Sequence, residues 1–88
     1  MKFDVVLLTQ KDCAFCDQAH EVLTRLQSEF TLKITTLDID SEDGTQMASE
    51  GGVMFSPGLF VDGKPFAYGR LSERKLRKHL QGLMRIPV

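Results

Sequence analysis

Cysteine is scarce in this sequence, which has only Cys13 and Cys16 among its 88 residues. Two cysteines cannot form the disulfide framework on which very small proteins rely, so that class is excluded. Hydrophobic residues make up 42% of the chain and charged residues 26%, which is the balance of a protein with an ordinary buried core. We therefore expect residues 1–88 to form a single α/β domain.

Long apolar runs are also absent. The run Val5-Val6-Leu7-Leu8 follows Asp4 and is too short for the core of a signal peptide. No segment approaches the length that crosses a membrane. The chain is therefore expected to be cytoplasmic and not to associate with membranes. In a reducing cytoplasm, two closely spaced cysteines are more often catalytic or metal-binding than structural.

The chain has no excess of positive charge. Its 11 basic and 12 acidic residues give a formal net charge of −1. This balance argues against a nucleic-acid partner, because phosphates favour a basic surface. One basic cluster lies near the C-terminus and is interpreted as the solvated face of a helix. It consists of Arg70, Arg74, Lys75, Arg77, Lys78 and Arg85.

Apolar and β-branched runs predict four strands. The runs are Phe3 to Leu8, Leu32 to Ile39, Leu59 to Val61 and Pro65 to Tyr68. The last two flank Asp62-Gly63-Lys64, and an Asp-Gly pair between two apolar runs predicts a hairpin.

A first helix begins at the cysteines, because apolar residues then recur at three- and four-residue spacing as far as Phe30. A last helix follows Ser72, a good N-cap residue, and carries an apolar stripe of Leu76, Leu80 and Leu83. The residues after it, 86–88, are expected to fray.

A short helix is predicted between these two. Asp40 and Ser41 offer N-cap chemistry at its start, and Gly51-Gly52 marks its end. Gly44 and Thr45 are poor helix formers, which makes this helix the weakest prediction. The order is then β-α-β-α-β-β-α. Its first βαβ unit should be parallel with a right-handed crossover, in a four-stranded mixed sheet with helices on both faces.

The cysteine pair lies where a strand ends and a helix begins. The helix N-terminus presents unpaired N–H groups and the positive end of the helix dipole, and both stabilise a thiolate. Such a position can lower a cysteine pKa from about 8.5 to roughly 3.5–7.5. Cys13, at the exposed end, is the expected nucleophile, and Cys16, one turn further along, is the expected resolving thiol. Lys11 could add to the stabilisation of the thiolate, which Asp12 would oppose unless it serves as the N-cap.

Metal binding is the other use of such a pair. Cys13, Cys16 and His20 could lie on neighbouring turns, but a zinc site normally needs a second pair of ligands. His79 is the only other histidine, so no metal and no cofactor are expected. An iron–sulfur cluster shared between two chains has no dedicated signal.

The whole chain resembles the thioredoxin superfamily, in particular its short glutaredoxin-like branch. The resemblance rests on the strand before the cysteines, the helix after them, Ser56-Pro57 before a strand, and the final hairpin and helix. It implies a thioredoxin fold in which a cis-proline, Pro57, faces the cysteine pair. It also implies that the backbone of Ser56 pairs with a bound thiol substrate.

The sequence departs from both main branches of that superfamily. The first strand lacks the buried aspartate of thioredoxins. The Gly-Gly and Asp that hold glutathione in glutaredoxins are replaced by Tyr68-Gly69-Arg70-Leu71-Ser72. The residues between the cysteines, Ala14-Phe15, are also atypical. Glutathione is therefore a doubtful partner, and another thiol or a flavoprotein reductase could supply the electrons.

These features predict a thiol–disulfide oxidoreductase that reduces protein disulfides as a monomer. Catalysis is assigned to Cys13 and Cys16. The substrate-binding residues are expected to be Lys11, Phe15, Ser56, Pro57, Gly69 and Arg70. Phe55 could join this apolar surface, although core packing suits it better than it suits Phe15. The alternatives are a binding module without turnover and a metal- or cluster-binding protein.

Overall fold

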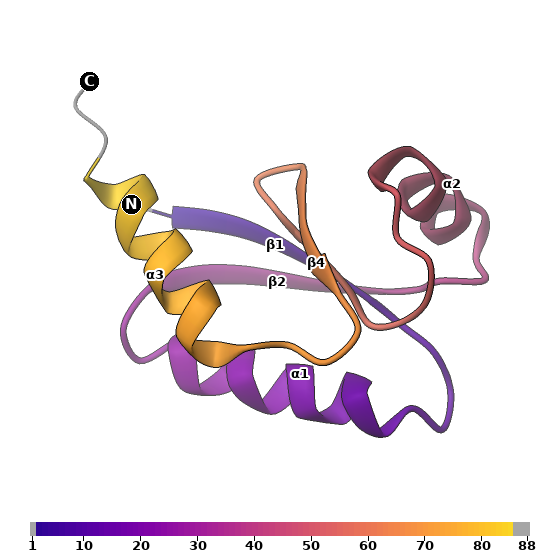
Figure 1. The fold of residues 1–88 in the computed structure, drawn as a ribbon, viewed down its shortest axis with the longest axis horizontal. Helices are drawn as coiled ribbons and strands as arrows, with labels where there is room; N and C mark the ends of the chain where they lie inside the picture. The colour runs from indigo at the N-terminus through magenta and orange to yellow at the C-terminus, as the bar shows by residue number, and fades with distance from the viewer. Residues whose placement is uncertain (1, 86–88) are drawn as a thin grey trace.

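The structure is a computed structural model that describes residues 2–85, so the tail predicted to fray at 86–88 lies outside the described residues. Seven elements follow one another in the predicted order β-α-β-α-β-β-α (Figure 1). They are β1 (Lys2–Thr9), α1 (Ala14–Leu26), β2 (Thr31–Asp38), α2 (Glu42–Gly51), β3 (Gly58–Val61), β4 (Lys64–Tyr68) and α3 (Glu73–Met84). Within residues 2–85, no helix is both long and apolar enough to cross a membrane.

The four strands form one mixed sheet in the order β2-β1-β3-β4. β1 pairs in parallel with β2 and antiparallel with β3, which in turn pairs antiparallel with β4. β1 is therefore a central strand, and its apolar residues are buried on both faces of the sheet, as continuous hydrophobic strands usually are.

The helices cover both faces of the sheet, as predicted. Alternate residues of β1, such as Phe3 and Leu7, join one core cluster together with residues of α1 and α3, including Leu23 and Leu76. On the other face a smaller cluster packs against α2. Figure 1 shows α2 set apart from α1 and α3. The smaller cluster consists of Leu8, Ala48, Val53 and Phe60.

α1 is shorter than its hydrophobic pattern predicted. The helix ends at Leu26, whereas the apolar spacing continued to Phe30. Phe30 lies beyond the helix but is still buried, and its ring meets Phe3 of β1 edge-on at 6.3 Å between centroids. The pattern extended too far because a loop residue can fill the same core position as a helical one.

α2 forms despite its poor helix formers. Its N-cap is Ser41, whose hydroxyl oxygen accepts from the N–H of Gly44 at 3.0 Å, and its C-cap is Gly52 in the left-handed conformation. Gly44 is buried, and a Cβ at that position would collide with the backbone carbonyl of Asp38. Glycine therefore allows the first turn of α2 to lie directly against the end of β2.

The turn of the β3–β4 hairpin has two residues, Asp62 and Gly63, with φ values of 49° and 81°. Two positive φ angles are the geometry that favours Asp-Gly in tight hairpins. Lys64, predicted to lie in the turn, is instead the first residue of β4. Asp62 also joins the hairpin to β1, because its Oδ1 accepts from the N–H of Asp4 at 2.8 Å.

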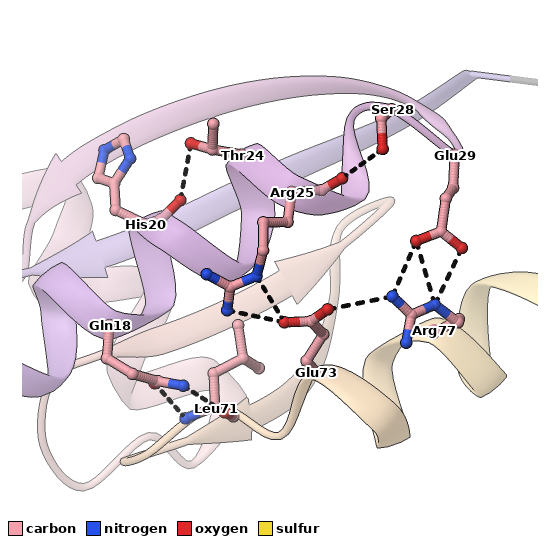
Figure 2. A network of polar contacts seen from close by, with 9 residues as sticks. All are labelled: Gln18, His20, Thr24, Arg25, Ser28, Glu29, Leu71, Glu73 and Arg77. Carbon is pink, nitrogen blue, oxygen red and sulfur yellow. Dashed lines mark hydrogen bonds and ion pairs between the residues drawn. The ribbon is translucent and has the colours of Figure 1, made fainter.

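A network of ion pairs joins α1 to α3 (Figure 2). Arg77 of α3 lies 2.8 Å from Glu29 and 3.0 Å from Glu73, and Glu73 lies 2.7 Å from Arg25 of α1. The guanidinium of Arg77 lowers the pKa of Glu29. Hydrogen bonds from Arg25, and then from Arg77, lower the pKa of Glu73. One member of the basic cluster is thus paired rather than simply solvated.

Gly44 of α2 and Gly82 of α3 predict opposite effects of substitution by alanine. Gly44→Ala should lower the free energy of unfolding by about 1–3 kcal/mol, because a backbone collision outweighs the better helix propensity. Gly82 of α3 has open space where its Cβ would lie, so Gly82→Ala should raise the free energy of unfolding by about 0.5–1 kcal/mol. Urea unfolding of both variants measures this contrast. Stabilisation by Gly44→Ala would contradict the packing at α2.

The ion-pair network predicts an acid-sensitive contribution to stability. Because the pKa values of Glu29 and Glu73 lie below their usual 4.5 in the folded protein, this contribution is present above pH 4.5 and is lost as the pH falls through the lowered values. Arg77→Gln should therefore destabilise the protein near neutral pH, and the effect should shrink below pH 4.5. Urea midpoints against pH measure it.

Lys78→Gln provides a matched control, since Lys78 is an exposed basic residue of α3 for which no ion pair is found among residues 2–85. An effect of Arg77→Gln that is independent of pH, or equal to that of Lys78→Gln, would contradict the assignment. High salt should reduce the effect, because these side chains are partly exposed.

Candidate active site

Cys13 is the N-cap of α1. Its backbone is extended, with φ −112° and ψ 104°, and its Sγ accepts a hydrogen bond from the N–H of Cys16 at 3.1 Å. The thiol position is therefore directed at the unpaired N–H groups of the first helical turn, as the sequence indicated. A negative charge on this sulfur would meet the positive end of the helix dipole. Asp12, weighed as the cap, is not the N-cap and has a positive φ of 56°.

Cys13 and Cys16 are joined by a disulfide, with their Cα atoms 5.2 Å apart. The two sulfurs differ in access: Cys13 is partly exposed, whereas Cys16 is buried with 4% of its surface accessible. A reagent from solvent therefore meets Cys13 first. No cluster of three or more His, Cys, Asp or Glu side chains that could hold a metal ion occurs within residues 2–85.

The loop before β3 lies opposite the cysteines. The Ser56-Pro57 peptide bond is cis, as predicted. The Oγ of Ser56 lies 3.8 Å from the Sγ of Cys13, although the two residues are 43 positions apart in the chain. Pro57 is buried and Ser56 is partly exposed. The structure thus brings together both cysteines, Ser56 and Pro57.

Gly69 belongs to the same region. It has a positive φ of 83°, and its N–H donates to the carbonyl of Pro57 at 2.7 Å. A Cβ on Gly69 would lie 3.2 Å from the ring of Phe55. The glycine therefore supports the Pro57 loop from the side of β4 and leaves room for an aromatic ring beside it.

Four large apolar side chains are exposed on the segments that carry the cysteines and the cis-proline, or pack against those segments, and are called the apolar rim. Phe15 lies between the cysteines in the chain, Met54 and Phe55 come directly before Ser56, and Tyr68 packs against Phe55. In chain order, the exposed fractions of these four side chains are 53%, 75%, 56% and 43%. The rings of Phe55 and Tyr68 meet edge-on with centroids 5.0 Å apart. Phe55 lies on the surface and is no more buried than Phe15, so the expectation that core packing would suit Phe55 better than Phe15 was wrong. The ring of Phe55 is exposed because the loop before the cis-proline turns it outward, beside Tyr68.

Sequence reasoning missed Met54 and Tyr68 as members of this rim. Their positions in the sequence could have suggested this role, since Met54 lies close to the predicted cis-proline and Tyr68 comes directly before Gly69. Single exposed apolar residues are common, however, and only the fold shows that Tyr68 packs against Phe55 of the cis-proline loop.

Among residues 2–85, no hydrogen bond or ion pair joins Lys11 or Arg70 to either cysteine. Lys11 is exposed and makes no hydrogen bond or ion pair with another of residues 2–85. Arg70 lines a hollow together with Gln18, Arg25 and Ser72, and neither cysteine belongs to its wall. Gln18 closes this side by bonding both backbone groups of Leu71, at 2.9 and 3.2 Å (Figure 2).

Gln10 is a polar neighbour that sequence reasoning did not identify. Its Oε1 accepts from the hydroxyl of Ser56 at 3.0 Å, and its Nε2 donates to the Oδ2 of Asp40 at 3.3 Å. Gln10 follows β1 and Asp40 follows β2. The sequence predicted these two segments only as connections between a strand and a helix. Nothing in their local pattern pointed to the cysteines.

The fold is shared with a solved structure. A mutant thioredoxin from Halobacterium salinarum matches with a TM-score of 0.72 and 20% sequence identity, over 98% of this chain and 78% of the thioredoxin chain. At this identity the likeness establishes the thioredoxin fold. No curated protein matches the sequence.

A family model described as a glutaredoxin-like domain (DUF836) matches residues 4–81. The matched span includes both cysteines, the cis-proline and Gly69. The match and the cysteine pair together support a thiol redox role in general. Because it covers most of the sequence, the chain belongs to the glutaredoxin-like domain family, within the thioredoxin superfamily.

Proposed function

We propose that the protein is a thiol–disulfide oxidoreductase that reduces disulfides in other proteins through Cys13 and Cys16. The observation that carries the proposal is the unequal access of a bonded cysteine pair at the start of α1. A partly exposed sulfur caps the helix, and a buried sulfur lies within bonding distance behind it. This is the arrangement that an attacking thiol and a resolving thiol require.

The reaction proceeds in two exchanges. The Cys13 thiolate attacks one sulfur of the substrate disulfide, whose other sulfur leaves as a thiolate and takes a proton from water. Cys16 then loses its proton and attacks the Sγ of Cys13, which breaks the mixed disulfide and releases the second substrate thiol. Two electrons have passed to the substrate, and the Cys13–Cys16 disulfide remains.

The start of α1 supports the first exchange. In the present structure the sulfur of Cys13 accepts a hydrogen bond from the N–H of Cys16 at 3.1 Å, and a thiolate on Cys13 could keep this bond. The thiolate would also lie at the positive end of the helix dipole. Both interactions are stronger with the charged form of the sulfur than with the thiol. They increase the fraction of attacking thiolate at neutral pH.

The apolar rim supports a protein substrate. Phe15, Met54, Phe55 and Tyr68 offer contacts to apolar side chains on either side of a substrate cysteine. The backbone of Ser56, next to the cis-proline, is proposed to pair with the substrate chain, as the resemblance to the superfamily implied. Lys11 and Arg70, both exposed, are proposed to contact charged groups of the substrate.

The source of electrons is proposed to be another thiol protein or a flavoprotein reductase in the cytoplasm. Ser72 occupies the region where glutaredoxins carry the aspartate that holds glutathione, and its Oγ instead caps α3 by accepting from Lys75 N–H at 3.2 Å. Only Gly69 remains of the paired glycines. These departures favour a partner other than glutathione.

Substitution of each cysteine separates the two proposed roles. The protein should accelerate the reduction of insulin by dithiothreitol, and Cys13→Ser should abolish this acceleration and leave only the uncatalysed rate. Cys16→Ser should lose turnover but retain attack, because the mixed disulfide on Cys13 can no longer be resolved. Mass spectrometry of the Cys16→Ser protein should detect a substrate peptide bonded to Cys13. Full activity of Cys13→Ser would contradict the proposal.

The apolar rim predicts a change in KM rather than kcat. Met54→Ser should raise KM for reduced protein acting on insulin by roughly three- to tenfold, since burial of one apolar side chain contributes about 1 kcal/mol or more. Turnover of a small disulfide such as hydroxyethyl disulfide should change little.

The matched control is Met84→Ser, because Met84 is 51% exposed but lies at the end of α3, outside the rim. Equal effects of the two substitutions on KM for insulin would contradict a docking role for Met54.

A further inference from the structure

Ser56 has a single hydroxyl proton and two acceptors within reach. Its Oγ lies 3.0 Å from the Oε1 of Gln10 and 3.8 Å from the Sγ of Cys13. A serine hydroxyl can donate to only one of them, while its lone pairs remain free to accept. The amide oxygen is closer and is a stronger acceptor than a disulfide sulfur. The proton therefore points to Gln10.

Asp40 sets the orientation of the Gln10 amide. Its ionised carboxylate can only accept hydrogen bonds, so it selects the Nε2 donor of Gln10, which lies 3.3 Å from Oδ2. The carbonyl end of the amide must then face Ser56. The reverse orientation would place the amide oxygen against the carboxylate. Asp40 is itself held at its backbone, where its N–H donates to Asp38 Oδ1 at 2.8 Å.

Strand register brings these residues together. β1 and β3 are antiparallel with Leu8 opposite Gly58, and two further residues along this register place Gln10 opposite Ser56. On the other side, β1 pairs with β2 up to Thr9 and Asp38, and the Ile39 N–H still donates to Thr9 at 2.8 Å. The contact is thus a product of the sheet and not of a chance meeting of surface side chains.

We propose that Gln10 and Asp40 are positioning residues that hold the Ser56 hydroxyl proton away from Cys13, so that in the reduced protein Ser56 presents a lone pair to this sulfur. This inference rests on the proposed function, which makes Cys13 the attacking thiol. A lone pair accepts from the S–H form of Cys13 and repels the thiolate. Gln10 and Asp40 therefore oppose the stabilisation that the start of α1 provides.

The consequence is a more strongly reducing cysteine pair. Thiol–disulfide oxidoreductases whose reduced form is highly stabilised act as oxidants. A thiolate that receives no proton from Ser56 is less stabilised, so the reduced protein gives up its electrons more readily. The hydrogen bonds from Asp40 through Gln10 to Ser56 would thus make the cysteine pair a better reductant of substrate disulfides.

The charged residues of the segments next to Cys13 stay constant in the central test. They are Lys11 and Asp12 in the preceding loop, Asp17 in the first turn of α1, and Asp40 after β2. Arg70, after β4, lines a hollow that excludes both cysteines. Gln10→Leu changes none of them. It removes a neutral acceptor from an exposed position, so the fold should persist, which a circular dichroism spectrum verifies.

The experiment measures alkylation of Cys13 by iodoacetamide against pH in the reduced protein, with the modified site assigned by peptide mass spectrometry. Gln10→Leu should lower the midpoint of this profile by about 0.5 pH unit, a roughly threefold larger ionisation constant, because the Ser56 proton can then turn to the thiolate. In a Ser56→Ala background the same substitution should leave the midpoint unchanged.

Gln46→Leu is the matched control, since the Nε2 of Gln46 also donates to a carboxylate, that of Glu50 at 3.2 Å within α2. It should not move the midpoint. Asp40→Asn supplies a second arm. Loss of the Asp40 charge should lower the alkylation midpoint of Cys13 both in the wild-type protein and in the Ser56→Ala background. Because the Gln10 amide is then free to turn, the midpoint should fall further only in the protein that retains Ser56.

A Gln10→Leu midpoint that is unchanged or higher would overturn the inference, as would a shift of equal size in the Ser56→Ala background. The measurement reports on Cys13 whether or not the protein turns over insulin. Failure of the inference is therefore distinguishable from failure of the proposed function, which rests on the trapped mixed disulfide of the Cys16→Ser variant.

Discussion

The pairing of β1 with β3 is the constraint on which the site depends. Its register ends with Leu8 opposite Gly58. The residues just beyond this pair are the loop that leads to Cys13 on one strand and the cis Ser56-Pro57 bond on the other. A shift of the register by one residue would separate the serine hydroxyl from the sulfur and turn the apolar face of the strand to the wrong side. β4 contributes in the same way, because its pairing with β3 brings the N–H of Gly69 to the carbonyl of Pro57.

A single side chain combines structural and chemical roles at this point. Cys13 caps α1, so the hydrogen bond that begins the helix also acts on the sulfur proposed to react. Cys16 lies within the first turn and is buried against the core. The helix is anchored by Val22, Leu23 and Leu26 in the main hydrophobic cluster and at its far end by the ion pairs to α3. The helix that carries the cysteines is thus anchored along its length, while Cys13 stays partly exposed at its start.

The polar surroundings of Cys13 have two opposing influences. The start of α1 favours a thiolate, whereas a serine hydroxyl whose proton is held by Gln10 does not. The first influence comes from the helix that Cys13 caps. The second, under our proposal, depends on Gln10 and Asp40, exposed side chains that follow β1 and β2 and contribute nothing to the core.

Much of this protein could be predicted from its sequence. Local patterns determined the seven elements, the Ser41 and Ser72 caps and the Asp62-Gly63 turn, because each depends on neighbouring residues. The positions of Cys13, Cys16 and Pro57 in these patterns also indicated the site. The family match and the shared fold agree with the predicted fold and with a thiol redox role in general.

Other features depended on tertiary structure alone. The exposure of Phe55, its pairing with Tyr68 and the contact of Gln10 with Ser56 join segments far apart in the chain, and no periodicity records such contacts. The end of α1 at Leu26 was similarly hidden, because Phe30 satisfies the same core from a loop. The sequence by itself determined that the cysteine pair lies at the start of a helix and that a proline precedes the third strand, since spacing and caps are local. Only the folded sheet decided which side chains surround the sulfur, because strand register is a long-range property.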